Sequence, residues 1–140
     1  MEVLKDVCEV ISGFAAVIAI IISIVFYRYG VNKERKVNTI KDLSEIRRKF
    51  FNTKDLDKKE KLKYLNELEF FATGINNKIY DIRTVEKMSG SRLIKQYDGW
   101  AASFIAARKE HYRNDNAYSE YEKMIKQLKR IRQTKKGRRR

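Results

Sequence analysis

The chain contains VISGFAAVIAIIISIVFY at residues 10–27, an uncharged run that is followed at once by Arg28, Lys33 and Arg35. At about 1.5 Å of rise per residue, this run covers roughly 27 Å of helix. The hydrocarbon core of a bilayer is about 30 Å thick, so the run nearly crosses it. We therefore predict a single transmembrane helix over residues 7–29.

The charges on either side of this run predict its orientation. Only Lys5 precedes it among the basic residues, whereas 31 of the chain's 32 Lys and Arg residues follow it. Because Lys and Arg resist translocation, we expect residues 1–6 to lie outside the cell and the chain after residue 29 to lie in the cytoplasm. A cleaved secretory signal is the alternative, but a basic n-region is nearly absent and no small-residue cleavage site closes the run.

The composition of the remaining chain predicts an acidic partner. After Tyr27 there are 31 basic and 15 acidic residues. The anionic inner leaflet attracts the basic residues, and each Lys or Arg held near its surface contributes about 1 kcal/mol of binding free energy. Nucleic acid competes for the same residues through counterion release. The single cysteine, Cys8, excludes a disulfide framework and a zinc site within one chain.

Apolar residues at three-and-four spacing predict helices throughout the rest of the chain, which contains no proline. The expected fold class is all-α: the transmembrane helix, then a cytoplasmic irregular bundle of about five helices over residues 30–131. The first helix begins near Lys33, after an interruption at residues 30–32. Its expected apolar stripe consists of Val37, Ile40, Leu43, Phe50 and Phe51.

Polar and glycine-containing segments mark the other helix boundaries. A break at residues 52–55 precedes a second helix, which Asp55 or Asp57 can cap and which Gly74 can end. Asp81 opens a third helix, and residues 98–99 mark the break before a fourth. The polar turn at residues 114–116 precedes the last helix.

Three of these helices place a charge on their apolar face. On a helical wheel, Glu69 falls among leucines, Arg108 falls beside Phe104, and Arg47 falls beside Leu43. An isolated buried charge costs several kcal/mol, so we predict a buried or half-buried cluster in which Glu69 bridges one or both arginines. The alternative is an anion pocket, since the two arginines leave one positive charge in surplus.

Several short motifs support a family resemblance. They are LNELEFFATGI at residues 65–75, Tyr80-Asp81, Met88-Ser89-Gly90, Tyr97-Asp98, Phe104-Ile105 and Arg108. Over roughly residues 35–130 the chain resembles the bacterial domain-of-unknown-function family numbered 4760. The resemblance implies a short membrane segment followed by a cytoplasmic helical domain, and it makes Glu69 and Arg108 motif positions. It implies no activity.

The C-terminal segment is strongly basic. From residue 123 to residue 140 there are ten basic residues and no acidic one. We expect residues 132–140 to form a disordered tail that rests on anionic lipid, with nucleic acid, an acidic protein or plain solubility as alternatives. The candidate contacts are Lys129, Arg130, Arg132, Lys135, Lys136, Arg138, Arg139 and Arg140.

No pattern in the sequence indicates an enzyme. The one histidine, His111, lies among charged residues near a helix end, and no phosphate loop or HExxH motif occurs. Glu67 and Glu69 are two residues apart on a helix and face different directions. We therefore expect no catalytic residue, no metal and no cofactor.

The function that these features favour is a membrane-anchored, non-enzymatic interaction module at the inner face of a bacterial membrane. It would act as a sensor, a scaffold or an inhibitory partner of a protein still to be identified. One alternative is a membrane-tethered nucleic-acid-binding factor, as in phage exclusion or plasmid maintenance. Another is a membrane-perturbing effector that forms homo-oligomers through its anchor.

Overall fold

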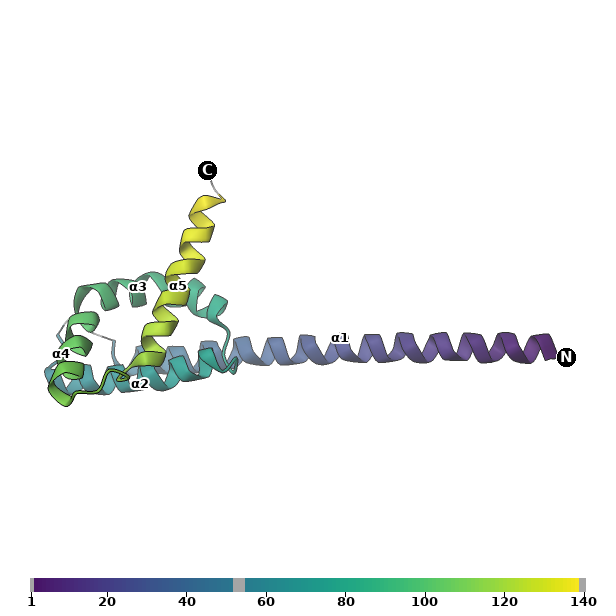
Figure 1. Ribbon diagram of the computed structural model, residues 1–140, viewed down its shortest axis with the longest axis horizontal. Helices are drawn as coiled ribbons and strands as arrows, with labels where there is room; N and C mark the ends of the chain where they lie inside the picture. Colours follow the sequence, from purple (N-terminus) through teal and green to yellow (C-terminus); the bar gives the residue numbers. More distant parts are fainter. Residues whose placement is uncertain (1, 52–54, 139–140) are drawn as a thin grey trace. The chain divides into compact units, whose positions relative to one another are not determined.

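The computed structural model describes residues 2–51 and 55–138. Every regular element within these two ranges is helical, which confirms the predicted all-α class (Figure 1). The elements are α1 (Glu2–Lys49), α2 (Lys58–Asn76), α3 (Ile82–Gln96), the π-helical turn η1 (Tyr97–Ala101), α4 (Ala102–Tyr112) and α5 (Ser119–Gly137). The chain divides into two units between Glu34 and Arg35, so α1 has residues in both.

The apolar run of the sequence lies in α1. Within the described ranges, α1 is the one helix that is long and apolar enough to cross a membrane, judged by length and composition. It begins within the predicted external segment and includes residues 2–6. The predicted interruption at residues 30–32 is wrong, because α1 continues through Gly30. One glycine inside a helix costs about 1 kcal/mol relative to alanine, too little to end a helix of this length.

The C-terminal part of α1, from Arg35 onward, belongs to the second unit and packs within it through a different face from the predicted one. Thr39, Leu43 and Ile46 are buried, and Phe50 is half-buried. Three residues of the predicted stripe are instead exposed; they are Val37, Ile40 and Phe51. The predicted stripe is wrong because it contains only apolar residues, whereas the buried face includes the polar Thr39. The Thr39 hydroxyl accepts the Asp81 N–H at 2.8 Å, so it can be buried with a hydrogen-bond partner.

α2 begins at the predicted cap and ends later than predicted. The Asp57 carboxylate accepts the Glu60 N–H at 2.7 Å, and the Glu60 carboxylate accepts the Asp57 N–H at 3.0 Å. These two bonds form a capping box. Gly74 does not end the helix, which continues to Asn76. The predicted break at residues 52–55 lies, apart from its last residue, outside the described ranges.

The π-helical turn η1 sets which face of α4 meets the core. In an unbroken α-helix at about 100° per residue, Ile105 would point roughly 160° away from the face that contains Val85 and Leu93. The π-helical turn contains one residue more than an α-helical turn. It therefore rotates α4 by about 100° relative to its position in an unbroken α-helix, toward the core. As a result, Ala101 and Ile105 are buried together with Val85 and Leu93. The predicted break at residues 98–99 is therefore wrong: the helical backbone is continuous from α3 to α4.

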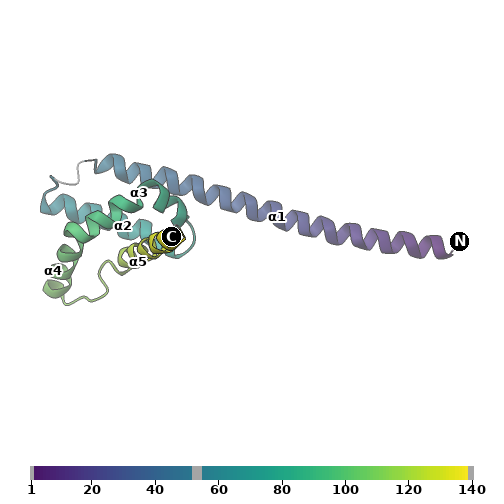
Figure 2. The same cartoon turned by 90° about the horizontal axis from the view of Figure 1, so that it is seen from above.

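The five predicted helical segments form one core within the second unit, although the first of them is the end of α1. The predicted count of about five helices after the anchor is therefore slightly high, since four α-helices, α2 to α5, follow α1 in the described ranges (Figure 2). The core is made mainly of aliphatic and aromatic side chains. Its largest fully buried members are Tyr121, Phe71, Leu43, Leu65, Leu68, Ile105, Met124, Ile125, Leu128 and Val85.

Two tyrosines of the second unit have raised pKa values, from which we expect a loss of stability at alkaline pH. Burial raises the pKa of Tyr64 from 10.0 to about 12, and the hydrogen bond to Asp42 together with burial raises the pKa of Tyr80 to about 12. The unfolded chain loses these protons first, so the free energy of unfolding falls as pH rises from about 10 toward 12. We expect the melting temperature to fall over this interval. The Tyr80→Phe variant should show a shallower fall, and an equal slope would contradict this assignment.

Candidate functional site

The Glu69 carboxylate caps the N-terminus of α5. It accepts the Tyr121 N–H at 2.7 Å and the Glu120 N–H at 3.2 Å. α5 needs an acceptor from elsewhere because its own cap residue, Tyr118, has a left-handed backbone and makes no capping side-chain bond. First-turn N–H groups lack partners within their helix and lie at its positive end, where a carboxylate is favoured. The charge on the apolar face of α2 is thus met by backbone amides.

Arg108 is half-buried among aromatic side chains. Its guanidinium lies 4.9 Å from the centre of the Tyr112 ring and close enough to the Tyr118 hydroxyl to affect its pKa. Burial raises the pKa of Tyr118, and the Arg108 charge opposes that rise. Within residues 2–51 and 55–138, no ion pair joins Glu69 to Arg108, so the predicted bridge between them is wrong. Glu69 instead has the amides of α5 as its partners.

Arg47 does not belong to a buried cluster either. Its side chain is exposed, and it makes no ion pair with Glu69 in the part of the chain that the structure describes. On α1 it lies about 70° from the centre of the buried face around Leu43 and Ile46, toward solvent. The predicted cluster of Arg47, Glu69 and Arg108, and the anion pocket proposed from it, do not form.

The basic C-terminal segment is helical rather than disordered through residue 137. α5 ends at Gly137, and Arg139 and Arg140 lie outside the described residues. Lys129 pairs with Asp98 at 2.6 Å. Arg130 and Lys136 are exposed on the same helix. The remaining predicted contacts face α3, and they are Arg132, Lys135 and Arg138.

Two of these residues, Lys135 and Arg138, help to form a groove between α3 and α5. The groove has a volume of about 460 Å³. Its walls carry four cations and one carboxylate, a net charge of +3. The lining residues are Arg83, Glu86, Lys87, Ile131, Thr134, Lys135 and Arg138. We call this feature the basic groove.

Glu86 organises the floor of the basic groove. Its side chain is only 8% exposed, and its two oxygens pair with Lys135 and with Arg132, the latter at 3.4 Å. Arg132 also donates to the Ser91 hydroxyl at 2.6 Å. The hydrogen bond from Lys135 and the nearby positive charges hold the pKa of Glu86 below its ordinary value of 4.5. These contacts explain why the helix continues past the predicted start of the tail at Arg132.

The α3 side of this groove was missed in the sequence. Arg83, Glu86 and Lys87 lie on one face of a helix, and they were not connected to the C-terminal segment because no local pattern pairs α3 with α5. Glu86 itself gives no signal for this pairing, because Arg83 at i−3 stands at a spacing at which the two side chains can already pair within α3.

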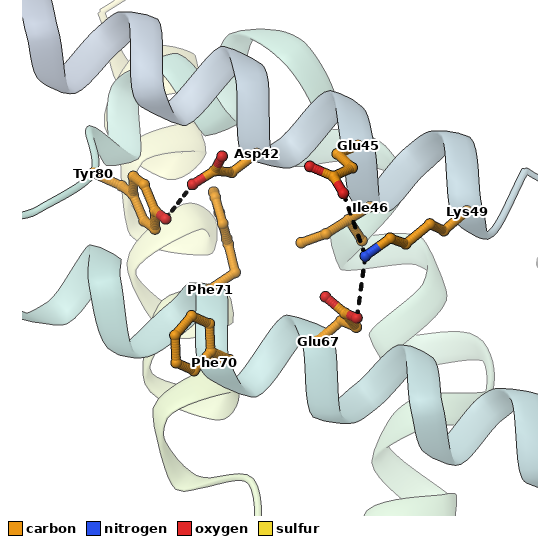
Figure 3. Close-up of a pocket in the computed structure, with 8 residues that line it drawn as sticks. All are labelled: Asp42, Glu45, Ile46, Lys49, Glu67, Phe70, Phe71 and Tyr80. Carbon is orange, nitrogen blue, oxygen red and sulfur yellow. Dashed lines mark hydrogen bonds and ion pairs between the residues drawn. The ribbon is translucent and has the colours of Figure 1, made fainter.

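A second, smaller pocket lies between α1 and α2 and has its polar groups already paired (Figure 3). Its volume is about 120 Å³. Lys49 lies 3.4 Å from Glu45 and 3.5 Å from Glu67, and the Tyr80 hydroxyl donates to Asp42. Because these side chains satisfy one another, this pocket offers a ligand fewer free charges than the basic groove. Among the described residues, no group of three or more His, Cys, Asp or Glu side chains is placed to hold a metal ion.

Comparison with known proteins identifies a family without an activity. No curated protein and no solved structure matches the chain. The model of the family described as "Domain of unknown function (DUF4760)" matches residues 13–128. This match includes residues 13–27 of the apolar run, the LNELEFFATGI motif at residues 65–75 and the first half of α5. It covers well over half of the chain, and the protein therefore belongs to the DUF4760 family.

Proposed function

We propose that the protein is a membrane-anchored, non-enzymatic interaction module at the inner face of a cell membrane. The observation that carries this proposal is the N-terminal part of α1, where every residue from 11 to 27 is exposed. Contiguous apolar surface of this extent is rare on soluble monomers and marks a membrane or protein contact. A bilayer can cover this apolar surface, and the helical backbone is suited to lipid because its polar groups are paired within the helix.

The distribution of charge supports a cytoplasmic location of the second unit. Basic residues follow the apolar run, with Arg28, Lys33 and Arg35 nearest to it. Such residues are retained on the cytoplasmic side and are attracted to anionic lipid. The second unit can then meet a partner that is confined to, or recruited to, the same surface.

A cysteine-accessibility experiment tests the anchor and its orientation. In a Cys8→Ser background, Val3→Cys should react with a membrane-impermeant maleimide in intact cells, whereas Lys136→Cys should react only after lysis. Both positions are exposed in the structure, so a failure of either cysteine to react shows that the membrane, and not the fold, shields it from the maleimide. Reaction of Lys136→Cys in intact cells would contradict the orientation, and recovery of the protein in the soluble fraction would contradict the anchor.

A crosslinking pull-down of the full chain from native membranes tests the interaction. We expect one protein to be enriched and to be lost when the second unit is unfolded by substitution in its core. Enrichment of nucleic acid that depends on Lys135 and Lys136 would contradict the proposal in favour of a tethered nucleic-acid binder. Recovery of the protein alone, in oligomers, would favour a membrane-perturbing effector.

A further inference from the structure

The basic groove contains more positive charge than its own residues compensate. Among residues 2–51 and 55–138, Arg83, Lys87 and Arg138 have no ion pair with a carboxylate. Arg83 and Lys87 are four residues apart on α3, a spacing at which like charges repel. This repulsion favours the binding of an anion between them.

These charges begin at the N-terminus of α3. Arg83 lies in the first turn, where the Asp81 carboxylate of the N-cap already accepts the Thr84 N–H at 3.0 Å. Helix N-termini carry partial positive charge, so a cation there is disfavoured and an anion is favoured. The Asp81 carboxylate offsets this positive end, so the positive potential at the groove comes from the side chains of Arg83 and Lys87.

Glu86 is the one carboxylate among the described residues of the groove lining, and its charge is offset by the two cations paired with it. One oxygen faces Arg132 and the other accepts from Lys135. The carboxylate thereby holds the Lys135 ammonium at the groove, where the lysine stem alone would leave it mobile. Thr134 adds a hydroxyl to the same wall, and Ile131 adds an apolar surface.

We propose that the basic groove is a binding site for a phosphate monoester. A monoester carries about two negative charges and three acceptor oxygens, which suit a site with several cationic donors. The volume of about 460 Å³ exceeds that of phosphate itself and leaves room for an organic substituent. The substituent is either a soluble metabolite or the glycerol of a lipid headgroup. This site is independent of the proposed interaction function and of the location of α1.

Calorimetry on the full chain in neutral detergent micelles tests the site. The probes are glycerol 3-phosphate, and mixed micelles of the same detergent that contain either phosphatidic acid, a monoester, or phosphatidylglycerol, a diester. We expect saturable binding of one monoester per chain. The Arg83→Gln/Lys87→Gln variant should weaken that binding by about tenfold or more, since charge-assisted hydrogen bonds are lost.

The Arg47→Gln/Arg48→Gln variant is the matched control. It removes the same number of positive charges from exposed positions outside the groove. We expect its affinity to stay within about twofold of that of the unmodified chain, because these two charges do not line the groove and charges separated from the ligand by solvent are screened at physiological salt. All four substituted side chains are exposed, so both variants should keep the melting temperature of the parent.

The probes also distinguish the two sources of phosphate. Binding of glycerol 3-phosphate supports a soluble ligand, and binding of phosphatidic acid in mixed micelles alone supports a lipid headgroup. Three results would overturn the proposal: no binding of either monoester, equal weakening by the groove and control variants, or equal affinity for phosphatidylglycerol and phosphatidic acid. The last two would indicate general attraction between a basic protein and an anionic surface.

Discussion

Replacing Glu69 with alanine is expected to lower the free energy of unfolding of the second unit by about 2 to 4 kcal/mol. The substitution removes two charge-assisted hydrogen bonds to the first turn of α5, from Glu120 and Tyr121. Both N–H groups then lack an acceptor in a partly buried place, and the helix loses a negative charge at its positive end. The effect is measurable by chemical denaturation and by faster hydrogen exchange at the start of α5.

Glu67 provides the control for this experiment. It lies on the same helix, but its contact is a solvent-exposed ion pair with Lys49 at 3.5 Å. Such pairs contribute little, so Glu67→Ala should change the stability by no more than about 0.5 kcal/mol. The Glu69→Gln variant keeps an oxygen acceptor without the charge and should fall between the two. Equal stabilities of Glu69→Ala and Glu67→Ala would show that Glu69 is not a cap.

Replacing Gly74 with alanine is expected to cost about 2 to 3 kcal/mol through overpacking. A β-carbon at this position would lie 2.4 Å from two ring atoms of Tyr80. The ring cannot move aside freely, because it stacks on Phe71 at a centroid distance of 4.8 Å and its hydroxyl donates to Asp42. The Tyr80 N–H also donates to the Gly74 carbonyl at 3.1 Å, which fixes the backbone between them.

A control and a rescue variant separate overpacking from a general effect of alanine. Gly99 has open space where a β-carbon would lie, so Gly99→Ala should be neutral or slightly stabilising. Adding Tyr80→Ala to Gly74→Ala should cost less than the sum of the two single changes, because the clash is removed. Additive losses, or a Gly74→Ala variant as stable as the parent, would contradict the predicted clash. Thermal denaturation measures both outcomes.

Local patterns in the sequence were sufficient for the fold class and for several helix ends. The cap at Asp57 follows from an acidic residue three positions before Glu60, and the cap at Asp81 follows from the same local chemistry. Along α5 the three-and-four spacing identified Tyr121, Met124 and Leu128 as core residues. Each of these features depends on residues within one or two helical turns, where spacing determines geometry.

Contacts between distant residues could not be predicted in the same way. The wheel correctly indicated that Glu69 faces neighbouring structure, but its partners are backbone amides about fifty residues further along the chain, which no composition rule identifies. Gly74 has the sequence context of a helix end, and its real role depends on a ring that packs against it after the chain turns. The basic groove likewise exists only because Arg132 and Lys135 reach Glu86 on another helix.

The π-helical turn between α3 and α4 limits where members of this family can gain or lose residues. Deleting one residue from Tyr97–Ala101 would restore a regular α-helix and rotate α4 by about 100°, which would carry Ile105 toward solvent. Inserting a residue would rotate α4 in the opposite sense. Substitutions in this segment change single side chains, whereas insertions and deletions displace the whole of α4. We therefore expect the number of residues between Leu93 and Ile105 to be constant among members, even where the residues themselves differ.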